Sequence, residues 1–117
     1  MNKLITLIAL SLISLTAHAK KSERYYQELM CPSNVGVMEH RLPDNRRVDC
    51  LTDTHAIEVD FAPKFFEAIG QSLHYAKMTG KRAGVYLIML KPSDEKHMRQ
   101  MIELILFYDL PIDVINK

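Results

Sequence analysis

Three acidic residues are spaced so that a small β-sheet would bring their side chains together. Glu39, Asp49 and Glu58 lie in three short stretches that are candidates for strands. Neighbouring carboxylates on a sheet repel each other unless something neutralises them, and a divalent cation with oxygen ligands can do so. Asp49, Glu58 and a backbone carbonyl would hold Mg²⁺, which would orient a water for attack on a phosphodiester. The alternative is a solvated acidic face softened by nearby arginines, and the spacing leaves both open.

Two turns set the register of these strands. If Pro43-Asp44-Asn45 is a three-residue loop, Glu39 falls opposite Asp49. If Asp53-Thr54 is a two-residue loop, Asp49 falls opposite Glu58, and the three carboxylates share one face. A slip of one residue would put them on opposite faces. Two residues along each strand from the three carboxylates, a second row would contain both basic and acidic side chains: Arg41, Arg47 and Asp60.

A polar stripe is expected on the helix that follows, from Ala62 to Thr79. At 100° per residue, Lys64, Gln71 and Tyr75 lie within about 40° of one another, and the apolar residues occupy other faces. These three side chains would form a polar helix face next to the row of carboxylates on the sheet. An ordinary exposed helix face is the alternative.

The order of elements predicts an α/β fold. A three-stranded antiparallel meander, a crossover helix and a buried strand form a mixed four-stranded sheet with helices on both faces. A C-terminal helix follows, and the last segment is a possible edge strand. The expected elements span residues 22–30 (helix), 35–42, 46–52 and 55–61 (strands), 62–79 (helix), 84–90 (strand), 93 to at least 106 (helix) and 111–115 (edge strand).

Residues 22–90 resemble the PD-(D/E)xK nuclease superfamily, with its restriction-endonuclease-like fold. The resemblance is carried by Val48-Asp49, by Ile57-Glu58-Val59-Asp60 and by Gln71-Ser72-Leu73-His74-Tyr75. The last is similar to the Gln-x-x-x-Tyr element of RecB-like nucleases, which are grouped with the Holliday-junction resolvases. The resemblance implies an αβββαβ core, the same order as above, in a single nuclease-like domain over residues 20–117.

The resemblance also implies roles for single residues. Asp49 and Glu58 would be catalytic ligands of Mg²⁺ or Mn²⁺. Gln71 and Tyr75 would support the site or touch the nucleic-acid backbone. The additional acid of the family would be Glu28 on the first helix or Glu39 on the first strand.

One departure from the family pattern concerns its lysine. Asp60 stands where the family has the Lys of Glu-x-Lys, so the charge that would position the attacking water is missing there. Lys64 could supply the ammonium from the helix, and Arg47 is the other candidate. Asp60 could instead be an extra metal ligand, or the chain could keep the fold without the reaction.

The first 19 residues have the pattern of a secretory signal peptide. Lys3 precedes an apolar run from Leu4 to Leu15, and Ala17-His18-Ala19 is a small-x-small cleavage site. The run has about a dozen residues, short of the ~20 that a membrane-spanning helix needs, so no stable membrane insertion is expected. Export predicts a periplasmic or extracellular protein.

Export also bears on the cysteines and on the charge balance. An oxidising compartment favours a disulfide between Cys31 and Cys50, and two buried free thiols are the alternative. Lys3 is the only charged residue of the leader, so 14 of the 15 basic residues remain to balance 14 acidic ones. A neutral chain has little unassisted affinity for nucleic acid, although basic residues can cluster locally.

Two functions therefore remain. The first is an exported, Mg²⁺-dependent hydrolase of DNA phosphodiester bonds, with Asp49 and Glu58 as ligands and Lys64 as the relocated lysine. The second is a catalytically degenerate protein of the same fold that acts as a binding or accessory module. By resemblance, a homodimer or a protein partner is expected.

Overall fold

A mixed sheet of five strands forms the centre of the computed structural model, which describes residues 20–116. The strands lie in the order β1-β2-β3-β4-β5; β1, β2 and β3 are antiparallel neighbours, and β4 and β5 continue in parallel with β3. The predicted α/β class is confirmed, and the possible edge strand is the fifth strand. The elements are α2 (Glu23–Met30), β1 (Gly36–Arg41), β2 (Arg47–Thr52), β3 (His55–Phe61), η2 (Ala62–Lys64), α3 (Phe65–Thr79), β4 (Arg82–Ile88), η3 (Pro92–Asp94), α4 (Glu95–Tyr108) and β5 (Ile112–Val114).

Helix ends follow from local chemistry. The Ser22 hydroxyl caps α2 by accepting a hydrogen bond from the backbone N–H of Tyr25 at 3.3 Å. Gly80 ends α3 with φ of 70°, a left-handed conformation that glycine adopts without a steric penalty. Ser22 and Gly80 mark these ends as predicted, whereas residues 62–64, predicted as the first turn of the second helix, form the 3-10 helix η2, and α3 begins at Phe65.

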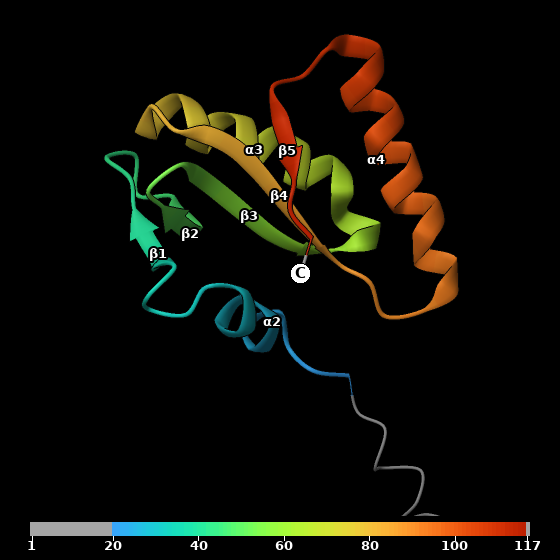
Figure 1. The fold of residues 1–117 in the computed structure, drawn as a ribbon, viewed down its shortest axis with the longest axis horizontal. Helices are drawn as coiled ribbons and strands as arrows, with labels where there is room; N and C mark the ends of the chain where they lie inside the picture. The colour runs from blue at the N-terminus through green and yellow to red at the C-terminus, as the bar shows by residue number, and fades with distance from the viewer. Residues whose placement is uncertain (1–19, 117) are drawn as a thin grey trace, which may run out of the picture.

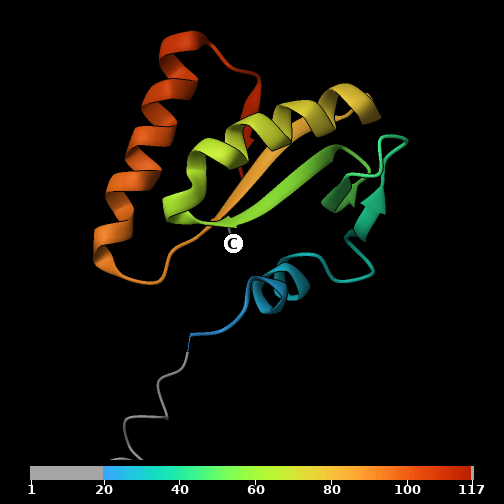
Figure 2. The ribbon, with the colours of Figure 1, turned by 180° about the vertical axis from the view of Figure 1, so that it is seen from behind.

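The helices cover both faces of the sheet. In Figure 1, α3 crosses behind β3 and β4, and Figure 2 shows it from the other side, in front of them. α3 and α4 share one core with β4 and β5, centred on Phe65, Val85 and Met101. α2 packs on the opposite face, where Met30 meets Ile57.

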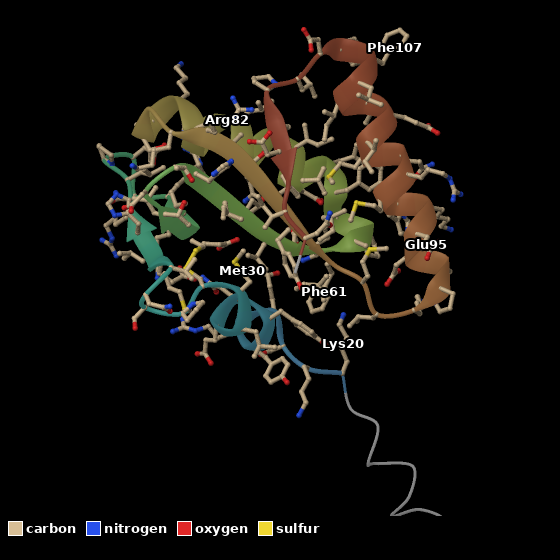
Figure 3. The ribbon with its side chains drawn as sticks, viewed as in Figure 1. Lys20, Met30, Phe61, Arg82, Glu95 and Phe107 are labelled. Carbon is tan, nitrogen blue, oxygen red and sulfur yellow. A yellow bond between two sulfur atoms is a disulfide. The ribbon has the colours of Figure 1, made fainter. Side chains whose placement is uncertain are left out.

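The start of α2 lies next to the end of β3. The ammonium of Lys20, the first described residue, lies 3.8 Å from the centroid of the Phe61 ring. Figure 3 shows the two side chains near each other. The ring of Tyr26 also meets that of Phe61, with centroids 6.2 Å apart. These contacts place the first turn of α2 beside the last residues of β3.

The predicted disulfide is present between Cys31 and Cys50. It joins the end of α2 to β2 across 19 positions of the chain. Both residues are buried in the core on the α2 side of the sheet. The bond therefore fixes α2 against the strand that carries Asp49.

Replacing both cysteines with alanine is expected to lower the free energy of unfolding by about 3 kcal/mol, the loop-entropy value for a closed loop of roughly 20 residues. Urea unfolding of the wild type with and without reductant should show the same loss. The double variant is the control, because reductant should not change its midpoint. A wild-type midpoint that is insensitive to reductant would contradict the expected contribution.

The predicted signal peptide falls on residues 1–19, which lie outside the described residues. Within residues 20–116, no helix has the length and apolar character needed to cross a membrane.

Candidate functional site

The strand register places Asp49 opposite Glu58. The pairs Arg41↔Arg47 and Cys50↔Ile57 have the offsets predicted from the two turns. The backbone N–H of Leu42 donates to the carbonyl oxygen of Arg46 at 2.8 Å, as a three-residue loop requires.

Regular pairing between β2 and β3 does not extend to Asp49. The regular pairs are Cys50↔Ile57 and Leu51↔Ala56. One step further, the Asp49 carboxylate accepts a hydrogen bond from the backbone N–H of Val59 at 2.8 Å. The side chain of Asp49 therefore lies between the two strands, next to Glu58.

Glu39 falls opposite Asp49, as the predicted register requires, but it forms no regular pair there, so the predicted flat row of three carboxylates is corrected. Glu39 has φ of 55°, a left-handed conformation that interrupts the alternation of a strand. On either side of Glu39, Met38 packs on the α2 side of the sheet, whereas Leu42, of the same parity, packs against Tyr75 of α3. The Glu39 carboxylate accepts a hydrogen bond from the Gln27 amide at 2.9 Å.

A polar cavity of about 300 Å³ lies beside Glu58, between β3, the first turn of α2 and the start of α3. Glu58 and Asp60 are buried, with 4% and 5% of their surface exposed. The cavity is lined by Glu23, Glu58, Asp60, Lys64, Glu67 and Gln71. We call this space, with the neighbouring Asp49, the acidic cavity.

Burial keeps the acids of this cavity partly protonated. Burial first, and then the negative charge of Asp49, raise the pKa of Glu58 far above its ordinary range. Burial also raises the pKa of Asp49. Burial, and then the charge of Glu23, raise the pKa of Asp60 to about 7. Charge in the cavity is therefore costly without a neutralising proton or cation.

One carboxylate oxygen at this site lacks a donor group as a partner. Oε2 of Glu58 is buried and accepts no hydrogen bond from a donor group within residues 20–116, and the Glu58 and Asp49 carboxyls hydrogen-bond to each other. A buried carboxylate oxygen without a partner is costly, and a cation that it could bind would offset this cost. No group of three or more His, Cys, Asp or Glu residues in the described part of the chain is arranged to hold a metal ion. Mg²⁺ commonly uses only one or two carboxylates and takes its other ligands from water and phosphate, so the Asp49 and Glu58 pair fits it.

Of the two candidates for the missing lysine charge, the structure brings one to the cavity. Lys64 lines the cavity, and its ammonium opposes the rise in the pKa of Asp60. Arg47 points elsewhere: its guanidinium is mostly exposed and lies 3.9 Å from Glu39. The predicted row of Arg41, Arg47 and Asp60 is therefore split, with the two arginines paired on the hairpin.

Glu28 does not reach the site. Its side chain is exposed and forms an ion pair with Arg24 at 3.1 Å. Glu23, five residues earlier on α2, lines the cavity instead and acts on Glu58 and Asp60. In the sequence, Glu23 has the ordinary place of an acid in a first helical turn, which gives no functional signal by itself.

The Gln71 and Tyr75 stripe lies along the same side of α3. Gln71 lines the acidic cavity. Tyr75 is buried, and burial together with the charges of Glu58 and Asp49 raises its pKa. The structure thus gathers Asp49, Glu58, Asp60, Lys64, Gln71 and Tyr75 in one region.

Comparison with known proteins does not place the chain in a family. No family model, no curated protein and no solved structure matches it.

Proposed function

We propose that the acidic cavity is the active site of an exported, divalent-cation-dependent hydrolase of DNA phosphodiester bonds. The observation that carries the proposal is the pair of adjacent carboxyls of Asp49 and Glu58 at a polar cavity, in which the buried Oε2 of Glu58 has no donor group as a partner. Resemblance of the motifs to PD-(D/E)xK nucleases supports the choice of substrate. The disulfide agrees with a periplasmic or extracellular location.

Asp49 and Glu58 would hold Mg²⁺ or Mn²⁺ through their carboxylates. Such an ion, when bound, polarises a phosphoryl oxygen and lowers the pKa of a water. Hydrolysis adds this water across a P–O bond and gives the leaving oxygen a proton. Asp60, with a pKa near 7, is suited to accept and return a proton at neutral pH.

Lys64 would offset the charge that develops on the phosphate in the transition state. Its ammonium comes from the start of α3, whereas the family has this charge on the strand. Preorganised charges of this kind contribute most in a site where water is restricted. Gln71, on the same wall, would orient a backbone oxygen of the substrate.

Replacing Lys64 with alanine is expected to lower the rate of plasmid nicking about 100-fold, within the range for loss of one transition-state contact. The assay uses the full chain, purified with its disulfide formed, with Mg²⁺ or Mn²⁺. Lys96→Ala, which removes an exposed lysine of α4, is the control and should cleave at the wild-type rate. Equal rates for the two variants would show that Lys64 has no role in the reaction. Absence of cleavage by the wild type would overturn the proposed reaction.

A non-catalytic binding module on the same fold is the second candidate. Two observations favour it: Asp60 stands in place of the family lysine, and the described residues hold no three-ligand metal group. This candidate predicts cation or DNA binding at the acidic cavity without strand cleavage. A partner protein or a second copy of the chain would then act on what is bound.

A further inference from the structure

A second polar cavity adjoins the acidic cavity along α3. It has a volume of about 240 Å³ and lies between α3 and the tip of the β1–β2 hairpin. Its lining residues are Arg46, Gly70, Gln71, His74 and Tyr75. Gln71 lines both cavities, so they are direct neighbours.

Arg46 and His74 already bind an oxyanion of the chain itself. Nη1 of Arg46 lies 3.1 Å from Oδ2 of Asp44, and Nε2 of His74 lies 2.6 Å from the same oxygen. Two cationic or hydrogen-bonding groups from different elements thus converge on one carboxylate oxygen. Their spacing suits an oxygen of a phosphate equally well.

Donors remain for a further anion in this cavity. A guanidinium has five N–H donors in a planar fork that matches a phosphate, and the Arg46 side chain is 64% exposed. The side chains of Gln71 and Tyr75 have no hydrogen bond with other residues in the 20–116 range. The negative charges of the acidic cavity, by contrast, repel the phosphates of DNA. Groups outside that cavity must therefore attract the DNA backbone.

The offset between the cavities matches the spacing of phosphates on a strand. The residues of η2 and α3 that line them are centred about five residues apart, or ~8 Å along the helix axis at 1.5 Å per residue. One strand of duplex DNA carries a phosphate about every 3.4 Å of its axis. Two to three phosphates therefore span the distance.

We propose that Arg46 and His74 form a phosphate-binding subsite, which holds the DNA backbone two or three nucleotides from the bond at the acidic cavity. This inference rests on the proposed function, because it takes DNA as the substrate. Asp44 competes with the phosphate for Arg46 and His74. The subsite therefore tunes affinity and register, while the chemistry stays at Glu58.

The first test measures binding in EDTA, where cation-dependent cleavage is absent. The probe is a fluorescent 12-base-pair DNA duplex, titrated with the full, oxidised chain at several salt concentrations. Arg46→Gln is expected to weaken binding several-fold at low salt and to reduce the slope of log K against log[salt] by about 1. Arg99→Gln, the same change on exposed α4, should alter neither value.

A second variant separates the subsite from a purely structural role of the hairpin. Asp44→Asn keeps the Oδ1 acceptor for the backbone N–H of Arg46, which Asp44 binds at 3.0 Å. It removes the competing charge, so affinity for the duplex should rise. No binding by the wild type, an unchanged slope in Arg46→Gln, or weaker binding by Asp44→Asn would overturn the subsite.

The outcomes for the subsite and for the reaction are distinct. If the protein cleaves DNA but Arg46→Gln has the same KM and the same salt slope as the wild type, the proposed function holds without the subsite. A protein that binds the duplex through Arg46 but cleaves nothing has the subsite without the reaction. Duplexes with one uncharged methylphosphonate should bind the wild type more weakly only when the change lies at the subsite phosphate, and Arg46→Gln should lose this dependence.

Discussion

Replacing Glu58 with glutamine is expected to reduce Mg²⁺- or Mn²⁺-dependent DNA cleavage by at least ~100-fold. Glu58 is buried, hydrogen-bonds with the Asp49 carboxyl and carries a buried oxygen that has no donor group as a partner. The amide keeps the shape of the side chain but removes the negative charge that a cation requires. Loss of a residue that only supports a metal ligand typically costs 10- to 100-fold, so loss of a ligand should cost more.

Glu28→Gln is the matched control for this prediction. The resemblance alone makes Glu28 a candidate for the additional acid, whereas the structure places it on the surface with Arg24. Cleavage by Glu28→Gln should therefore equal that of the wild type. Equal rates for Glu58→Gln and Glu28→Gln would contradict the assignment of the acidic cavity.

Without a divalent cation, the free energy of unfolding is expected to fall as the pH rises from about 5 to 8. The pKa values of Asp49, Glu58 and Asp60 are raised in the folded protein, so it binds more protons than the unfolded chain in this range. Stability must then fall with pH, by up to about 1.4 kcal/mol per pH unit for each full proton of difference. The loss continues until the folded-state pKa values are passed.

Other acids act at the opposite end of the pH range. The pKa of Asp113 is lowered, first by its hydrogen bond from Arg82 and then by that from His55. The stability that such a lowered pKa contributes is present above about pH 4 and is lost on further acidification. Maximal stability of the cation-free protein is therefore expected near pH 4 to 5.

Urea unfolding in EDTA at pH 5 and pH 8 measures the effect of the raised pKa values. Glu58→Gln should be more stable than the wild type at pH 8, and its stability should depend less on pH, because it no longer has the carboxyl group with the largest rise in pKa. Glu28→Gln is again the control. Parallel pH profiles for the wild type and Glu58→Gln would show that burial of Glu58 does not govern stability.

Local rules predict the fold well. The lengths of two turns predict the registers, which place Glu39 opposite Asp49 and Asp49 opposite Glu58, and the regular strand pairs have the same offsets. Ser22 and Gly80 mark helix ends because a hydroxyl cap and a left-handed residue are properties of single positions. The apolar run predicted as a buried strand over residues 84–90 forms part of β4 as far as Ile88, and the exposed Met89 and Leu90 follow the strand.

Which residues line the acidic cavity depends on tertiary structure, which rules about single positions and periodicity do not describe. The period-2 pattern assumes a regular strand, whereas Glu39 is left-handed and its neighbours Met38 and Leu42 pack on different sides of the sheet. Which acid of α2 reaches the cavity depends on how the helix docks. The disulfide at its end and the contacts of Lys20 and Tyr26 with Phe61 bring its first turn, and hence Glu23, to Asp60.

The contacts at the tip of the β1–β2 hairpin also could not be predicted from local sequence rules. Asp44 is a turn residue in the sequence, and nothing local links it to a histidine 30 positions later. The tip of the hairpin packs on α3, where Asp44 contacts His74. The cavity lined by Arg46 and His74 is therefore a consequence of tertiary structure.

The most direct test of the account is the thermal unfolding midpoint at pH 8 as Mn²⁺ is added to the wild type, Glu58→Gln and Glu28→Gln. A cation that binds only the folded protein stabilises it by RT ln(1 + [L]/Kd). The account predicts midpoints that rise with Mn²⁺ for the wild type and Glu28→Gln, and a flat response for Glu58→Gln. A flat response of the wild type, or an equal rise in Glu58→Gln, would contradict a cation site at Asp49 and Glu58.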